Sequence, residues 1–251
     1  MRKIILHYHL FKNAGTSVDE MLKANFGERW VTREFPAGHA LNQAQVMQWI
    51  RSEPAAVAFS SHTALLPVPR APDLQVFPIV FVRHPIDRIA SAYAFERRQG
   101  GDGFGAVLAR NTTLAGYIEV RLSQPHDRQC RDFHCARLAQ MYGADSGSEA
   151  ERALRALEAL PFVGIVEDFE GSLARMERWL APHFSGFRKQ VVARNVSHDR
   201  QLPLEDRLAQ VAAELGPQAH QRLLDANAGD LRLHDAVQEL LAPGASRTGA
   251  P

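Results

Sequence analysis

The stretch 3-KIILHYHLFKNAGTSVDEML-22 decides the fold of this chain. Residues 3–9 are short, apolar and rich in isoleucine, a composition that predicts a buried strand. A polar turn over residues 12–15 follows directly, and a helical pattern opens at Thr16 and Ser17. A buried strand that leads through a tight turn into a helix is the opening unit of a parallel α/β sheet.

The rest of the chain continues this alternation. Further strands are predicted at residues 55–60, 76–82 and 162–166, and helices at 42–51, 85–98, 148–160, 169–180 and 204–241. Residues 112–142 show a mixed helical pattern, and residues 188–203 are interpreted as a loop. Short apolar strands that alternate with helices favour an α/β fold of three layers, in which helices flank a central, mainly parallel sheet. We expect one domain over residues 1–242 and a disordered tail over 243–251.

Composition excludes several classes of protein. The 45% hydrophobic and 23% charged fractions of the 251 residues are those of a globular chain. A formal net charge of +1 disfavours a globally basic nucleic-acid binder. No run reaches the roughly 18 apolar residues that a membrane span needs, and the opening stretch lacks the long apolar region of a signal peptide. We therefore expect a cytoplasmic protein with no membrane span and no nucleic-acid partner.

The two cysteines, Cys130 and Cys135, are too few for a disulfide framework. They are expected to be reduced thiols or to form one local disulfide. His126 and His134 lie nearby, but the C-x4-C spacing does not fit the common zinc patterns. We expect no metal.

The first turn that carries chemistry is Lys12-Asn13-Ala14-Gly15-Thr16-Ser17. Gly15 lets an anion approach the backbone closely, and Thr16 and Ser17 offer amides and hydroxyls at the positive end of a helix. Lys12 adds a full charge. The turn therefore predicts a phosphate cradle, although a lysine followed by a Thr/Ser helix cap is also a common structural feature. It is not a Walker A loop, in which the lysine follows the last glycine.

The second such turn is 83-RHPIDRIASAY-93, at the end of the strand predicted over 76–82. Arg83 leaves the strand at its carboxyl end, where its guanidinium can grip a phosphate with two hydrogen bonds. Pro85 and Asp87 suit the start of a helix, and Ser91 lies two helical turns beyond Arg83. Arg83 could instead be a surface ion-pair partner and Ser91 a neutral helix residue. Two anion-binding turns at neighbouring strand ends nevertheless favour a phosphorylated ligand.

The two turns together resemble the sulfotransferases that use 3′-phosphoadenosine 5′-phosphosulfate (PAPS), closest to the carbohydrate (uronosyl) 2-O-sulfotransferase type and its bacterial relatives. Weaker support comes from FSSHTALLPV (59–68), FVGIVEDFEGSLARMERWL (162–180) and ARNVSHDRQLP (193–203). The resemblance covers most of residues 3 to 210 and implies a single sulfotransferase domain with a P-loop-like fold. One departure is Phe11, where many relatives have proline, and another is Ser61, where the carbohydrate enzymes often show glycine.

The resemblance also implies roles for individual residues. Its cofactor-binding set is Lys12, Asn13, Ala14, Gly15, Thr16 and Ser17 for the 5′-phosphosulfate, Arg83 and Ser91 for the 3′-phosphate, and Asn195, Ser197 and Arg200 in a loop that closes over the nucleotide. Sulfuryl transfer parallels phosphoryl transfer, so a cation must stabilise the bridging oxygen and a base must take the acceptor proton. Lys12 matches the cation and His62 the base, with Glu34 and His9 as alternative bases.

These assignments imply a hydroxylated small molecule or glycan as acceptor. Two alternatives stay open at the level of the sequence. One is a P-loop-like kinase, which the absent Walker lysine and the absence of a clear magnesium carboxylate disfavour. The other is a catalytically silent nucleotide-binding module.

Overall fold

The computed structural model describes residues 1–36, 39–189 and 202–242. Its centre is a sheet of five strands in the order β2-β3-β1-β4-β5, and every neighbouring pair is parallel. The strands are β1 (Arg2–Tyr8), β2 (Trp30–Thr32), β3 (Ala58–Ser61), β4 (Leu74–Val82) and β5 (Val163–Ile165). The predicted α/β fold with a parallel sheet is confirmed. Because β1 lies between β3 and β4 and is parallel to both, the turns that follow these three strands lie together at the carboxyl-terminal edge of the sheet.

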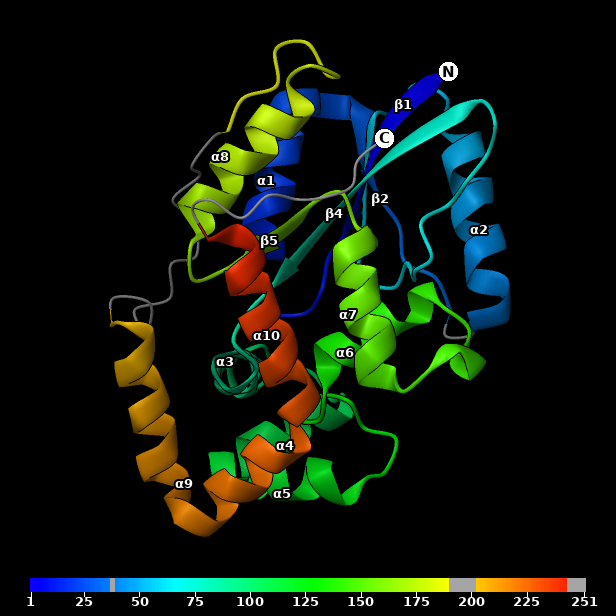
Figure 1. The fold of residues 1–251 in the computed structure, drawn as a ribbon. Coiled ribbons are helices and arrows are strands. Elements are labelled where there is room, and N and C mark those ends of the chain that lie inside the picture. Colours follow the sequence, from blue (N-terminus) through cyan, green and yellow to red (C-terminus); the bar gives the residue numbers. More distant parts are fainter. Residues whose placement is uncertain (37–38, 190–201, 243–251) are drawn as a thin grey trace.

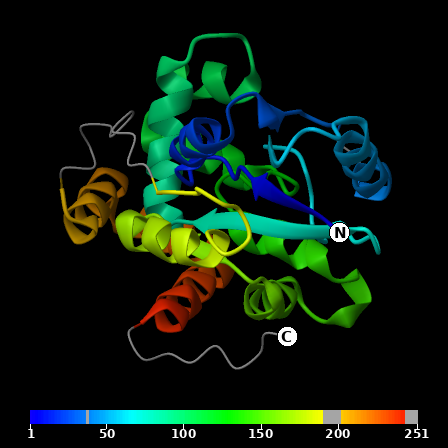
Figure 2. The same cartoon turned by 90° about the horizontal axis from the view of Figure 1, so that it is seen from above.

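Helices cover both faces of this sheet. They are α1 (Gly15–Phe26), α2 (His39–Ser52), α3 (Pro85–Arg98), α4 (Phe104–Asn111), α5 (Leu114–Ser123), α6 (Phe133–Leu138), α7 (Glu149–Ala159), α8 (Phe169–Leu180), α9 (Leu204–Ala226) and α10 (Ala228–Leu241), with short 3-10 turns at Gly27–Arg29, Ala139–Met141 and Ala144–Ser146. Figure 2 shows α1 on one side of the sheet and α7 and α10 on the other. The three predicted layers are thus present.

Alternation along β1 explains how the two faces are buried. Ile4 and Leu6 belong to the core cluster beneath α2, α7 and α10, whereas Ile5 belongs to the cluster beneath α1 and α8. All three side chains are fully buried. A strand buried on both faces is typical of a parallel sheet, and this is why residues 3–9 form a nearly continuous apolar run.

A third apolar cluster joins α3, α4, α5 and α9 beyond the carboxyl ends of the strands. Figure 1 shows these helices gathered at the end of the molecule toward which β4 runs. Tyr117 and Ile89 are among its fully buried members. These helices therefore lie beside the edge of the sheet from which the turns at residues 12–17 and 83–93 emerge.

One strand and one α-helix of the described residues were not predicted from the sequence, the edge strand β2 and the helix α4. β2 is three residues long, too short to show a period of its own. The segment predicted as helical over 204–241 is interrupted twice. Gly216, with φ of 72°, breaks α9 before Pro217. Asn227 then separates α9 from α10, and its amide donates to the carbonyls of Cys130 and Leu223. Asn227 therefore marks the change of direction between the two helices.

Helices α6 and α10 cap each other. The carboxylate of Asp230 accepts hydrogen bonds from the backbone N–H groups of His134 and Cys135, at 2.9 and 2.7 Å. In return, the carboxylate of Asp132 accepts from the backbone N–H of Asp230 at 2.9 Å. Each carboxylate satisfies amides that the first turn of the other helix leaves unpaired. This exchange fixes two segments that lie almost a hundred residues apart in the chain.

Several sequence predictions can be placed against the structure. Cys130 and Cys135 are buried free thiols, the first of the two expected alternatives, and burial raises the pKa of Cys130 to about 12. Among the described helices, none is both long and apolar enough to cross a bilayer. Asn195, Ser197 and Arg200, and the tail 243–251, lie outside the described residues.

Candidate active site

The two turns with a predicted anion-binding role, residues 12–17 and 83–93, lie next to each other in space. β1 and β4 are hydrogen-bonded neighbours, with Tyr8 opposite Val80, so their carboxyl ends emerge side by side. The Arg83 guanidinium donates to the backbone carbonyl of Lys12 at 3.3 Å. Two cationic residues 71 positions apart in the chain therefore share one edge of the sheet.

The first turn has an unusual backbone. Lys12 and Ala14 adopt left-handed conformations, with φ of 63° and 60°, which cost energy for residues other than glycine. Ala14 is the N-cap of α1, and no side chain caps this helix. The first amides of α1 therefore point outward at a positive helix end, where an external anion can satisfy them. This geometry, called the cradle below, suits a phosphate or sulfate group.

Gly15 is required at the floor of this cradle. A Cβ atom at this position would lie 2.1 Å from Cδ2 of the His9 ring and 2.3 Å from its Nε2. The His9 ring thus lies directly over Gly15. No larger residue fits unless His9 moves, so the glycine permits a close approach of side chain to backbone.

A buried polar chain anchors the cradle from behind. Asn13 donates through Nδ2 to the carbonyl of Phe11 and accepts through Oδ1 from Nε2 of His134, at 2.8 Å. The other ring nitrogen of His134 donates to Asp230 at 2.9 Å. His134 therefore links Asn13 to a fully buried carboxylate through its two ring nitrogens. The strained turn is therefore held by α6 and α10.

The Lys12 side chain lies against α3. Its ammonium lies 4.5 Å from the centre of the Phe95 ring, a cation–π distance, and Phe95 belongs to α3. Phe11 packs edge-on against the same ring at 5.6 Å. Phe11 stands where many members of the resembled family have proline, and it fastens the cradle to α3 by aromatic packing instead.

Arg83 belongs to a three-membered ion cluster. Its Nε donates to Asp87 at 2.6 Å, and Arg207 of α9 donates to both oxygens of the same carboxylate, at 2.9 and 3.0 Å. Burial alone would raise the pKa of Asp87, but the two guanidinium groups outweigh burial and hold the pKa below its usual range. Asp87 thus aligns two cations at one place. Ser91 is partly buried on α3, and its hydroxyl makes no hydrogen bond to another described residue.

His62 follows β3 and is paired with Glu34. Its Nδ1 lies 2.8 Å from Oε1 of Glu34, and the same carboxylate accepts from the backbone N–H of His62 and the hydroxyl of Thr63. Burial opposes ionisation of Glu34, but these donors hold its pKa below the usual value. The His62 side chain is 52% exposed. Glu34 therefore orients His62 by its Nδ1 and leaves Nε2 available at the surface.

Three histidine rings form a stack at this edge. The ring of His9 lies 3.8 Å from that of His62 and 5.3 Å from that of His7, centre to centre. The Asp19 carboxylate accepts from Nδ1 of His7 at 2.8 Å and of His9 at 2.7 Å. Burial raises the pKa of Asp19, but the two histidines more than reverse this and lower it. The cradle and His62 are thus in direct contact through His9.

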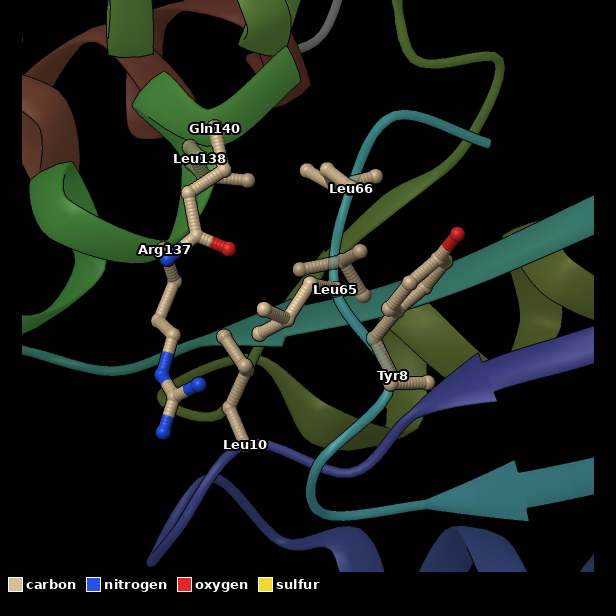
Figure 3. Close-up of a pocket in the computed structure, with 9 residues that line it drawn as sticks. Tyr8, Leu10, Leu65, Leu66, Arg137, Leu138 and Gln140 are labelled. Carbon is tan, nitrogen blue, oxygen red and sulfur yellow. The ribbon is translucent and has the colours of Figure 1, made fainter. Parts of the chain in front are cut away.

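A small cavity lies beside the site and is too small to be the site itself. It measures about 10 Å³, room for roughly one water, and is lined by residues that include Leu10, Leu65 and Leu66. Figure 3 shows the guanidinium of Arg137 beside Leu10. Arg137 makes no hydrogen bond or ion pair with another described residue, and burial lowers its pKa. The end of the sheet where the Arg83 guanidinium meets the Lys12 carbonyl is the candidate active site.

Sequence reasoning located both turns and His62 but missed the residues that hold them. These residues are Asp19, Arg207 and Asp230, and nothing in the local pattern of the sequence singles them out. Each acts through a contact across the fold, with residues 10–12, 120 and 96 positions away respectively. Only the H-x-H pattern at His7 and His9, which puts both rings on one face of β1, was a signal within the sequence.

Comparison with known proteins agrees with this geometry. A family model described as "Sulfotransferase family" matches residues 2–152, a range that contains both turns and His62. An uncharacterized protein of Archaeoglobus fulgidus is 41% identical over 251 residues, covering 97% of this chain and 99% of that protein. The match over more than half of the chain shows that this protein belongs to the sulfotransferase family, whose members transfer sulfuryl groups.

Proposed function

We propose that the protein transfers a sulfuryl group from PAPS to a hydroxyl group of a carbohydrate acceptor. The observation that carries this proposal is the contact between the two turns, in which Arg83 donates to the carbonyl of Lys12. A ligand with phosphate groups at two positions on one nucleoside needs two adjoining cationic sites. The cradle at residues 12–17 would take the 5′-phosphosulfate, and Arg83 with Ser91 the 3′-phosphate.

The transfer is an in-line displacement. The acceptor oxygen forms a new bond to sulfur while the bond from sulfur to the bridging oxygen of the donor breaks, and 3′-phosphoadenosine 5′-phosphate leaves. Negative charge develops on that bridging oxygen. Lys12 and the uncapped amides of α1 supply the countercharge. Asn195, Ser197 and Arg200 remain predicted contacts of a loop that closes over the nucleotide. The single domain and the cytoplasmic location also remain predictions.

The acceptor proton goes to Nε2 of His62. Glu34 accepts the Nδ1 proton of this ring, which keeps the lone pair of the neutral ring on Nε2. Glu34 itself is a poor base, because hydrogen-bond donors surround it and hold its pKa low. His9 is 9% exposed and lies behind His62, where an acceptor has less access. The carbohydrate specificity rests on the resemblance of residues 59–68 to the carbohydrate enzymes.

Ligand binding tests the donor assignment. Thermal stability is measured with 3′-phosphoadenosine 5′-phosphate and with ATP plus magnesium. We expect stabilisation by the bisphosphate without metal, and its loss in Arg83→Ala. Arg51→Ala is the matched control, since Arg51 is exposed and pairs with Asp73 near the opposite ends of the strands. A preference for ATP–magnesium would support the kinase alternative instead.

Turnover tests the catalytic assignment. With labelled PAPS and a panel of hydroxylated acceptors, His62→Ala should lower the rate about 10²- to 10⁴-fold while leaving bisphosphate affinity nearly unchanged. Glu34→Gln should lower the rate less, because the ring remains but loses its orientation. Unchanged turnover in His62→Ala would remove this histidine from its role.

A further inference from the structure

Arg137 on α6 is a cation without a counter-ion in the described part of the chain. Its side chain is partly buried, and its guanidinium makes no hydrogen bond or ion pair with another described residue. The guanidinium carbon lies 5.6 Å from the centre of the Phe133 ring, a contact that positions the group but does not neutralise its charge. A partly buried guanidinium has up to five N–H donors to satisfy, so an anionic partner would offset the cost of its burial.

A cavity of about 400 Å³ adjoins this guanidinium, which is a volume that suits a small-molecule ligand. Its charged lining residues are Arg121, Asp127, Arg128 and Arg137. Arg121 is paired with Glu96 and Asp127, and Arg128 donates two hydrogen bonds to Glu149. Arg137 is thus the one charge of this lining that no described acidic group balances. The cavity therefore favours a ligand with a negative group.

Arg137 lies beside the candidate active site. It lines the small cavity described above together with Leu10, two residues before Lys12, and Leu65, three residues after His62. Figure 3 shows its guanidinium beside Leu10 and Leu65 in the same view. A group bound by Arg137 is therefore close to the segments that carry the proposed cation and the proposed base.

Helix α6 is fixed to the cradle but belongs to the other face of the sheet. His134 is bonded to Asn13 of the cradle, and Arg137 follows it by three residues, about 4.5 Å along the helix axis. Leu138 packs in the core cluster that contains Ile4, whereas α1 packs in the cluster on the opposite face. Arg137 is therefore separate from the N-terminus of α1, where the proposed function puts the phosphosulfate of the donor.

On the basis of the proposed function, we infer that Arg137 binds an anionic group of the acceptor, a carboxylate or a sulfate, and so selects acceptors that carry such a group. Its planar guanidinium can donate two parallel hydrogen bonds to either group. This contact holds the acceptor in one orientation, with a hydroxyl directed toward the base. A neutral acceptor leaves the guanidinium unpaired. Arg137 is thus a specificity residue, which touches the acceptor away from the reacting oxygen.

Matched acceptors test this specificity. Turnover is compared for the methyl glycoside of a neutral hexose, the corresponding uronic acid and the corresponding 6-sulfate. Hydrogen bonds to a charged group predict that kcat/KM favours an acidic member about 10- to 100-fold. In Arg137→Gln this preference should disappear, mainly through KM, while kcat/KM for the neutral glycoside stays the same.

Arg128→Gln is the control for diffuse charge, because Arg128 lines the same cavity but is already paired with Glu149. This variant should keep most of the preference for the acidic acceptor. Equal losses in Arg128→Gln and Arg137→Gln would refute a specific contact at Arg137. Urea unfolding excludes a merely structural role: removal of a cation without a counter-ion should not destabilise the protein, and a large loss of stability with an unchanged preference overturns the inference.

Binding without turnover separates this inference from the proposed function. The cradle is first saturated with 3′-phosphoadenosine 5′-phosphate, and the three sugars and inorganic sulfate are then titrated into protein labelled with ¹⁵N-arginine. The Nε–H signal of Arg137, assigned by its loss in Arg137→Gln or, if that variant does not fold, in Arg137→Lys, should shift with an acidic sugar and not with the neutral one. No shift with any anionic probe, or equal affinity for free sulfate, overturns the inference and leaves the donor assignment intact. Failure to bind the bisphosphate overturns the proposed function itself.

Discussion

Replacement of Asp230 by alanine should both destabilise the protein and weaken donor binding. The carboxylate is buried and accepts three hydrogen bonds, from the backbone N–H groups of His134 and Cys135 and from Nδ1 of His134. Its removal leaves these three buried donors without an acceptor and uncaps the first turn of α6. An unsatisfied buried donor costs about 1–3 kcal/mol, so we expect a loss of stability of at least that size.

The effect is also expected at the cradle. Asn13 is bonded to Nε2 of His134, so a His134 ring released by Asp230 no longer fixes the strained backbone at Lys12 and Ala14. We expect the affinity for 3′-phosphoadenosine 5′-phosphate to fall about tenfold at temperatures where the variant is folded, as is typical when a supporting shell is lost. This loss should appear although Asp230 does not itself belong to the cradle.

Urea unfolding and bisphosphate titration together test this reasoning. Asp235→Ala, on the exposed face of the same helix, is the control and should change stability by less than about 0.5 kcal/mol. In a double-mutant cycle with His134→Gln, the two substitutions should couple by roughly 0.5–3 kcal/mol. A loss below about 1 kcal/mol in Asp230→Ala would show that this carboxylate is not the anchor described here. A large loss of stability with unchanged affinity would refute only the link to the cradle.

Three further outcomes are expected. Gly15→Ala places a Cβ 2.1 Å from the His9 ring, so it should weaken bisphosphate binding at least tenfold in calorimetry; full affinity would show that His9 moves aside at no cost. Burial lowers the pKa of His84 from 6.5 to about 4. Between these two pH values the unfolded chain binds a proton at His84 that the folded chain does not, so the free energy of unfolding decreases as the pH falls. From pH 7 to 5 the unaltered protein should lose roughly 2 kcal/mol more than His84→Asn in urea unfolding, and equal losses would contradict this. Arg207→Ala removes one of the two cations on Asp87, so binding should become weaker and less sensitive to salt, whereas an unchanged salt dependence would place Arg207 outside the anion's field.

The family match and the fold agree with what the local pattern of the chain predicted. Strands buried on both faces must be apolar along their whole length, and this requirement made β1, β4 and β5 visible as runs of apolar residues. Glycine, hydroxyls and cations gathered in a short segment are the local signal of a candidate anion site, and this signal singled out residues 12–17 and the Arg83 turn. The edge strand β2 could not be found, because three residues show no period.

The sequence by itself determined the parallel sheet, the two turns at its edge and the position of His62 after β3, because each depends on residues that are neighbours in the chain. Tertiary structure alone decided what holds these groups in place. Asp19 binds two histidines of β1, Glu34 orients His62, and Asp230 secures the cradle through His134. These contacts join segments that are distant in the chain and that meet only because helices pack against the sheet. No sequence pattern marks such pairs. The charges of the candidate site are therefore balanced by the fold.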